Sequence, residues 1–248
     1  MLRWVSFFLL FALIILCTFT GYIYTYRAEF LSAELSKALD VQVKIKSIGL
    51  TKNGLKIKGL RLHNPPDCTA KNALIIDKIL LKTDLSEILK IITGINSDKI
   101  FIDQIKIDKP EMNIELFSIT GSDNNWKRIL AKVAAAKKAT SSRQFEVKKV
   151  ILTNVQLEAN FHALPKTILK PAPIEKIELK NVGSGHPVDI RAVIHEILKQ
   201  LTEHSSKQLG LDQMQSAKLD SKTSKVSSKE INEGREMLQA LMKKNKKK

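Results

Sequence analysis

The sequence predicts an α+β fold in which an N-terminal transmembrane helix precedes a curved, bulged antiparallel-type β-sheet with the shape of a groove. Short amphipathic helices interrupt this sheet, and a disordered basic tail follows it. Three observations lead to this prediction: an uncharged N-terminal run, a strand pattern that recurs with a central interruption, and a C-terminal change to Ser, Lys and Gln. The chain has 248 residues, with 41 Lys and Arg against 25 Asp and Glu, which leaves room for one or two modest domains.

The first predicted element is a transmembrane signal anchor within residues 1–26. From Trp4 to Tyr26 there are 23 residues without a charge, and as a helix they reach roughly 34 Å, enough for a hydrocarbon core of about 30 Å. Trp4 at one end and Tyr22, Tyr24 and Tyr26 at the other place amphipathic rings at both membrane interfaces. A cleaved signal peptide is the alternative, but the apolar run is long for one and no small-residue cleavage site follows it.

The orientation of the anchor follows from the length of the chain after it. Positive charges flank the span on both sides, but long downstream domains translocate largely regardless of charge. We therefore expect the N-terminus in the cytoplasm and residues 27–248 on the other side of the membrane. Residues 27–40 are expected to form a juxtamembrane amphipathic helix, because their apolar side chains recur at helical spacing. This apolar stripe consists of Phe30, Leu31, Leu35, Ala38 and Leu39.

A strand pattern with a central interruption recurs six times within residues 41–204. In each copy, two apolar residues with one residue between them are followed by a two-residue gap and then by a second pair of the same spacing. The copies are Val43, Ile45, Ile48 and Leu50; Leu55, Ile57, Leu60 and Leu62; Leu74, Ile76, Ile79 and Leu81; Ile100, Ile102, Ile105 and Ile107; Val150, Leu152, Val155 and Leu157; and Ala172, Ile174, Ile177 and Leu179. Because side chains alternate between the two faces of a strand, the gap turns the second pair outward unless an additional residue bulges.

The gap residues are mostly polar, as in Lys46-Ser47 and Asp103-Gln104, and they suit an extruded β-bulge that bends the strand. Bends repeated in adjacent strands curl a sheet into a trough with one continuous apolar face. Two alternatives remain open. The gaps could be hairpin turns, although several lack the Gly or Asn that such turns favour. The strands could also be unbulged and buried on both faces, against which the many intervening lysines argue.

Turn and helix signals divide the predicted groove domain, residues 41–204. Asn53-Gly54 predicts a hairpin, whereas Asn64-Pro65-Pro66-Asp67 and Lys109-Pro110 predict strand ends. The remaining predicted elements are a strand over 111–119, helices over 85–92, 126–139 and 188–201, and a basic linker over 137–144. The linker is expected to form a seam between two sub-halves of one sheet.

The last predicted region is a basic, largely disordered tail over residues 205–248. It carries 11 basic and 5 acidic side chains, and its polar composition leaves too little apolar surface to bury. A short helix over 229–242 is compatible with its few apolar residues. The tail is expected to contribute solubility or to attract anionic headgroups, at roughly 1 kcal/mol for each basic residue close to a charged membrane.

The order of these elements resembles the N-terminal region of the AsmA-like envelope proteins of double-membrane bacteria. The resemblance covers roughly residues 1–135 and rests on Asn64-Pro65-Pro66, on Thr83-Asp84-Leu85 before a helix, on the strand end at 107–110 and on Asn125-Trp126. It implies a protein of the inner membrane that projects a β-groove into the periplasm and takes part in phospholipid movement. Roughly seven strands at about 4.8 Å spacing give a groove on the order of 35 Å long, so it works locally unless partners extend it.

The sequence contains no motif for catalysis, for a cofactor or for a metal site. His195-Glu196 begins like a zincin helix, but Lys199 stands where the second histidine ligand is required. Cys17 and Cys68 are too few for a disulfide framework. Nucleic acid is not an expected partner, because the basic residues alternate through the sheet and aromatic side chains for base stacking are scarce.

We therefore expect a non-enzymatic, membrane-anchored protein that binds phospholipid or helps to transfer it. Its lipid-groove residues are expected to be the apolar residues of the six copies, apart from Ala172, with lysines at the rim that meet phosphate headgroups. Other envelope proteins are possible partners that extend the groove. The alternative is an envelope assembly scaffold whose sheet face is filled by its own helices, and whose edge strands or tail recruit protein partners.

Overall fold

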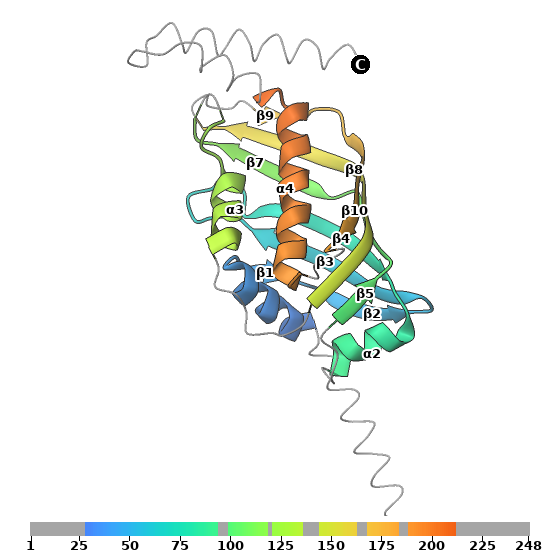
Figure 1. The fold of residues 1–248 in the computed structure, drawn as a ribbon. Helices are drawn as coiled ribbons and strands as arrows, with labels where there is room; N and C mark the ends of the chain where they lie inside the picture. The colour runs from blue at the N-terminus through green and yellow to red at the C-terminus, as the bar shows by residue number, and fades with distance from the viewer. Residues whose placement is uncertain are drawn as a thin grey trace, which may run out of the picture.

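The computed structural model describes residues 28–93, 99–118, 121–135, 144–162, 168–183 and 188–211 (Figure 1). These residues form a mixed α/β fold built around one large sheet. The predicted anchor over residues 1–26, the predicted linker up to residue 143 and the predicted tail beyond residue 211 lie outside the described residues. None of the helices within the described ranges is long and apolar enough to cross a membrane.

Ten strands make up the described sheet: β1 (Val43–Lys44), β2 (Ser47–Thr51), β3 (Gly54–His63), β4 (Asn72–Lys82), β5 (Lys99–Ile102), β6 (Gln104–Asp108), β7 (Glu111–Leu116), β8 (Gln144–Phe161), β9 (Ile168–Leu169) and β10 (Ile174–Val182). The helices α2 (Leu85–Thr93), α3 (Asn125–Ala135) and α4 (Ile190–Gln208) accompany them. Residues 28–39 are also helical and are called the 28–39 helix. The four predicted helices are thus confirmed where the structure describes them.

The folded part of the chain extends further than the sequence predicts. We expected α4 to end near residue 201 and the tail to begin at residue 205. Instead, α4 continues to Gln208, and Ser205, Leu209 and Leu211 are buried. The predicted boundary at residue 204 is therefore wrong, because the apolar side of the helix continues into residues whose polar neighbours concealed it.

The sheet is mixed, which corrects the expected antiparallel type. Its strands follow the order β1-β3-β4-β6-β8-β10, and β2, β5, β7 and β9 pair alongside this path. The β3–β4 and β8–β10 pairs are antiparallel, but β5, β6 and β7 run parallel to β8. The connection from β7 to β8 contains α3, and a crossover of this kind lets β8 start in the same direction as β7.

The repeated copies lie side by side, and their apolar residues form rows across one face of the sheet. One row crosses Ile48, Ile57, Ile79, Ile107, Leu152 and Ile177, and the next crosses Leu50, Leu55, Leu81, Ile105, Val150 and Leu179. We call this the inner face, because the helices pack on it. The expectation that the copies share one apolar face is confirmed.

The central interruptions lie side by side in five of the six copies, whereas Asp103-Gln104 of the remaining copy lie beside Lys148 and Lys149. The pairing of β1 and β2 with β3, of β3 with β4, and of β8 with β10 keeps one register before and after this level. These five copies therefore have their additional residue at the same level and stay in register there, whereas the sequence predicts a one-residue β-bulge in each copy. Gly59, Lys109 and Asn154 stand there with φ angles of 63°, 50° and 54°, so a left-handed residue accommodates the additional position. A register shift in the β3–β4 pair lies elsewhere, between Leu62 and His63.

The turn predictions are confirmed in place, and one of them needs correction in its residues. The hairpin between the first two copies is confirmed, but its turn residues are Lys52 and Asn53, because Thr51 pairs with Gly54. The strand end at Lys109-Pro110 is confirmed, because β6 ends at Asp108, although β7 continues beside β8 in the same register. Proline is tolerated at this point because the ladder is interrupted there and needs no N–H donor.

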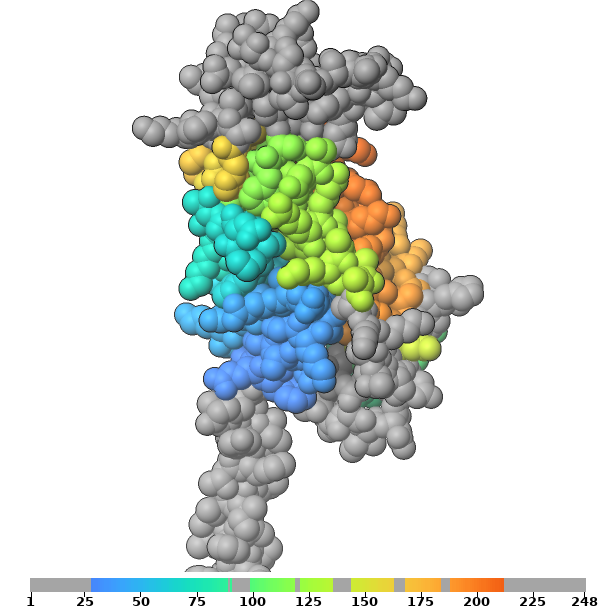
Figure 2. Space-filling view, turned by 90° about the vertical axis from the view of Figure 1, so that its left-hand side faces the viewer, coloured from blue at the N-terminus to red at the C-terminus, as the bar shows by residue number. Residues whose placement is uncertain are grey.

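The inner face of the sheet is covered mainly by α3 and α4 (Figure 1). α4 contacts β8 and β10, and its residues Val193, Leu198 and Leu201 join the sheet in one apolar core. α3 contacts both α4 and β7 and buries Trp126 and Ile129. Figure 2 shows the segment of α3, in green, directly above the first described residues, in blue, with α4 in orange beside it. The expected open trough is therefore largely filled by helices of the same chain.

The 28–39 helix protects one edge of the sheet. Ser36 Oγ accepts a hydrogen bond from the Val43 N–H (2.8 Å), and Ser32 Oγ accepts one from the Ile45 N–H (2.9 Å). These hydroxyls satisfy edge groups of the backbone that are otherwise open to another strand. Because the helix turns this serine side to the sheet, Phe30 of the predicted apolar stripe is 69% exposed.

Candidate functional site

The predicted lipid-groove residues lie together on the inner face, but most of them belong to the closed core. In β8 and β10, Val150, Leu152, Val155 and Ile177 are at most 2% exposed. The other buried members are Val43, Ile45, Leu55, Leu62, Leu74, Ile76, Ile79, Ile100, Ile102, Ile105, Ile107, Leu157 and Leu179, and Ile174 is half-buried. Packing against the chain's own side chains is thus the main role of these residues.

Five predicted groove residues on β2, β3 and β4 are still accessible. Ile48, Ile57, Leu60 and Leu81 are half-buried, and Leu50 is 55% exposed. We call these five residues the apolar strip. They share the inner face, whereas the main contacts of α3 and α4 are with β7, β8 and β10. An apolar surface of this kind, at the less covered end of a curved sheet, is suited to part of an acyl chain.

A separate hollow lies next to β1, between the 28–39 helix and residues 40–45. Its volume is about 680 Å³, and its lining includes Ser32, Ser36, Val43 and Ile45. The same serine hydroxyls that bind the β1 backbone therefore face this hollow. The hollow lies next to the helix that directly follows the predicted anchor in the sequence.

A buried carboxylate forms the centre of a polar cluster near the end of β7. The Glu115 side chain is 1% exposed and accepts hydrogen bonds from the backbone N–H groups of Thr69 (2.8 Å) and Ala70 (2.6 Å). His162 Nε2 lies 2.6 Å from Glu115 Oε2. Burial alone raises the pKa of Glu115, but these hydrogen bonds outweigh it and hold the pKa below its ordinary value. Ionised Glu115 thus ties the loop after β3 to β7.

Asn125, the first residue of α3, replaces a neighbouring strand beside the end of β7. Its Oδ1 accepts a hydrogen bond from the Glu115 N–H (2.9 Å), and its Nδ2 donates to the Asn113 carbonyl (3.0 Å) and to Asn64 Oδ1 (2.6 Å). Trp126 Nε1 donates to the same Asn113 carbonyl (2.9 Å). These contacts satisfy backbone groups that no strand pairs, so the Asn64 and Asn125-Trp126 motifs have a joint structural role.

The cluster also contains a thiol, but its chemistry is not that of a nucleophile. Burial raises the pKa of Cys68, and the nearby Glu115 carboxylate raises it further, to about 11. The thiol therefore stays protonated at neutral pH, whereas thiol nucleophiles act as thiolates. In the described part of the chain, no three His, Cys, Asp or Glu side chains gather in a group that could hold a metal ion.

Sequence reasoning missed the Glu115–His162 pair. Glu115 occupies a position that alternates with Ile114 and Leu116 and thus reads as a solvated, outward-facing carboxylate. It is buried because the loop that contains Thr69 and Ala70 folds over it. Alternation along one strand contains no signal for this cover, because the covering loop is 45 residues away in the sequence.

Comparison with known proteins assigns no family to this chain. No protein-family model matches the sequence, and neither the curated proteins nor the solved structures give a match. The resemblance to the AsmA-like family stays a prediction that rests on the sequence motifs. The predicted membrane-interface residues, Trp4, Tyr22, Tyr24 and Tyr26, lie outside the described residues.

Proposed function

We propose that this chain is a non-enzymatic, membrane-anchored protein that binds phospholipid, or helps to transfer it, through the apolar strip on β2, β3 and β4. The anchor is the uncharged segment from Trp4 to Tyr26, and the bulk of the chain is periplasmic, with the N-terminus in the cytoplasm. The anchor thus holds the protein in the inner membrane of a double-membrane bacterium. In this proposal the protein contributes to lipid homeostasis of the envelope, as the resemblance to AsmA-like proteins implies.

The observation that carries this proposal is the accessibility of the apolar strip. Leu50 is 55% exposed and stands at one end of its row, whereas the row members on β8 and β10, at the other end, are buried. Apolar surface in contact with water costs about 25 cal/mol of free energy for each Å². An acyl chain that covers Leu50 and its half-buried neighbours removes this cost. The strip spans three strands, roughly 10 Å at about 4.8 Å spacing, so it shelters part of one chain and acts locally.

The experiment uses photocrosslinking at two adjacent positions that face opposite sides of β2. A photoreactive amino acid is placed at Leu50, on the inner face, or at Thr51, on the outer face, of the full chain in nanodiscs of phospholipid. Mass spectrometry then identifies lipid adducts at each position. We expect adducts at Leu50 that are at least about fivefold more abundant than at Thr51, and Ile57→Asp should remove them. Equal labelling at both positions would contradict the proposal.

The scaffold is the second candidate, and one observation favours it. α3 and α4 fill most of the inner face with side chains of the same chain, as the scaffold hypothesis requires. The same photocrosslinking experiment separates the two functions. Adducts at Leu50 that contain a protein and no lipid would support the scaffold.

A further inference from the structure

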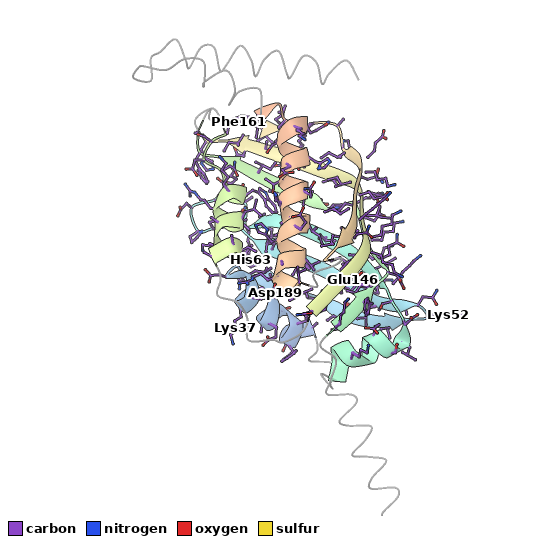
Figure 3. All side chains as sticks on the ribbon, in the orientation of Figure 1. Lys37, Lys52, His63, Glu146, Phe161 and Asp189 are labelled. Carbon is purple, nitrogen blue, oxygen red and sulfur yellow. The ribbon has the colours of Figure 1, made fainter. Side chains whose placement is uncertain are left out.

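The outer face of the sheet, opposite the helices, has a regular array of lysines on β3, β4 and β6. We call Lys56, Lys58, Lys78, Lys82 and Lys106 the basic face. Each alternates along its strand with residues of the inner apolar rows, so all five project away from α3 and α4. Four of them are exposed and Lys56 is half-buried. Figure 3 shows side chains that project from the sheet on the side away from α4, with Lys52 at the tip of the β2–β3 hairpin.

The charges of the basic face are not neutralised by the fold. Within the described ranges, none of the five lysines forms an ion pair. Lys58 and Lys78 stand directly opposite each other in the β3–β4 pair, an arrangement of like charges that destabilises a sheet. Asp108 stands opposite Lys78, but its Oδ1 accepts the Thr153 hydroxyl at 2.8 Å.

The other half of the outer face is built differently. Glu178 on β10 binds Lys149 at 3.1 Å and Lys176 on its own strand. Lys148 binds Asp103 at 2.7 Å. The lysines of β8 and β10 therefore have partners within the protein, so the unpaired lysines of the basic face are a local feature and not a consequence of the overall charge of +16.

The side chains between these lysines point to one kind of partner. Leu80 pairs with Lys56 on one side and with Lys106 on the other, and Lys106 pairs with Ile151. Lysine and apolar residues thus alternate across four strands. Phosphate headgroups above a hydrocarbon layer match this alternation, since ammonium groups meet phosphates while short apolar side chains reach the acyl boundary. A single-stranded nucleic acid needs aromatic platforms, and these paired positions contain none.

We propose that the basic face binds the surface of a bilayer that contains anionic phospholipid. Each lysine near such a surface contributes roughly 1 kcal/mol, about a fivefold change in affinity. The repulsion between Lys58 and Lys78 is retained in the free protein because the anionic surface offsets it on binding. The inference goes beyond the lipid site proposed above, because the two surfaces lie on opposite faces of the sheet and can fail independently.

Vesicle flotation tests this inference. The full chain is held in nanodiscs of neutral phosphatidylcholine and is mixed with vesicles of phosphatidylcholine with or without 30 mol% phosphatidylglycerol, about a third of the lipid. One variant combines Lys56→Gln, Lys58→Gln, Lys78→Gln, Lys82→Gln and Lys106→Gln. The control combines Lys37→Gln, Lys132→Gln, Lys170→Gln, Lys199→Gln and Lys207→Gln, which removes the same charge from exposed lysines elsewhere and leaves the tail unchanged.

We expect the basic-face variant to bind anionic vesicles more than about tenfold more weakly, and the control variant to change binding less than about threefold. Wild-type binding should weaken with added salt. Equal losses in both variants would overturn the inference, because total charge would then explain binding. Tighter binding of a single-stranded oligonucleotide than of vesicles, at equal phosphate concentration, would overturn it in favour of nucleic acid.

A second variant keeps the test independent of folding. Lys58→Gln alone relieves the Lys58–Lys78 repulsion, so its melting temperature should stay the same or rise while binding to anionic vesicles falls. A fall in melting temperature would mean that Lys58 stabilises the fold, against the inference. Lipid adducts at Leu50 should be unaffected by the basic-face variant, so failure at one surface is distinguishable from failure at the other.

Discussion

The two halves of the sheet are built from the same strand pattern but differ on both faces. In the half formed by β7, β8 and β10, α3 and α4 bury the inner row residues, and the outer lysines of β8 and β10 have carboxylate partners. In the half formed by β2, β3 and β4, the five residues of the apolar strip are accessible while their inner neighbours, such as Leu62 and Ile79, are buried, and the lysines of the basic face form no ion pairs with other described residues. The strand pattern therefore decides which face is apolar, and the helices decide whether that face is core or surface.

This difference suggests a division of labour. The covered half provides the stability of the fold, since its apolar residues are fully removed from water. The less covered half has an accessible surface on each face of the sheet. The apolar strip lies on the inner face, and the basic face lies on the outer side. Substitutions of apolar row residues should therefore have unequal effects on stability in the two halves. The first of four experiments tests this expectation, and the other three test contacts that support the fold.

The largest effect is expected from Leu152→Asp in the covered half. Leu152 is 1% exposed and lies between Ile107 and Ile177 in the apolar row, so the new carboxylate would be buried without a partner. We expect a loss of at least about 4 kcal/mol in unfolding free energy, measured by urea denaturation. Leu50→Asp, in the neighbouring row of the open half, should cost less than about 1 kcal/mol. Similar losses for both would show that the two halves are equally closed.

Asn125→Ala should produce the next largest effect. It removes the acceptor of the Glu115 N–H, which is left without that partner, and one of two donors to the Asn113 carbonyl, which keeps Trp126 Nε1. We expect a loss of about 2–3 kcal/mol, again by urea denaturation. Asn160→Ala on β8, at a half-buried position, is the control and should cost less than about 1 kcal/mol. A loss no larger than in the control would contradict the strand-replacing role of Asn125.

The pH dependence of stability should report on Glu115. Because its pKa is lowered in the folded protein, the unfolded chain takes up the proton first as the pH falls. The stabilisation is complete above the ordinary glutamate pKa of about 4.3 and is lost as the pH falls through the lower folded value. Thermal unfolding between neutral and acidic pH measures this loss. Glu115→Gln should be less stable at neutral pH and less sensitive to acid, whereas Glu158→Gln should retain the wild-type profile.

The smallest effect is expected at the level of the interruption. Gly59 has a φ of 63°, and a Cβ there would lie 2.8 Å from Lys46 Cβ, so Gly59→Ala should cost about 1 kcal/mol. Gly49→Ala in the paired strand has a nearest neighbour at 3.9 Å and no positive φ. It should be neutral or slightly stabilising. Equal melting temperatures for the two variants would argue against a strained left-handed residue at this level.

Much of the fold is predictable because its signals are local. The helix over 28–39 and α2, α3 and α4 follow from apolar spacing, although α4 continues to Gln208 and not only to residue 201. The shared apolar face follows from alternation and a single additional residue in each copy. The sequence could not reveal that the additional residues of five copies lie at one level, because this depends on how neighbouring strands pair across the sheet and not on any one strand.

The candidate sites show the same limit. The rows that contain Leu50 and Leu152 were both expected in the groove, and only one of these leucines is accessible. Glu115 and His162 were not expected together, since they lie 47 residues apart and meet through β7 and β8. Direction of pairing was also hidden, because parallel alignment of β5, β6 and β7 with β8 depends on where α3 returns the chain.

Alternation of residue types within each short segment specifies which side chains share the apolar face and which lie on the opposite face, because side-chain direction along a strand depends on nearest neighbours alone. Which apolar residues become core is settled when helices from distant parts of the chain dock on that face. Burial is a property of the assembled layers and not of a segment, so leucines in identical local patterns end up either beneath α4 or in contact with solvent.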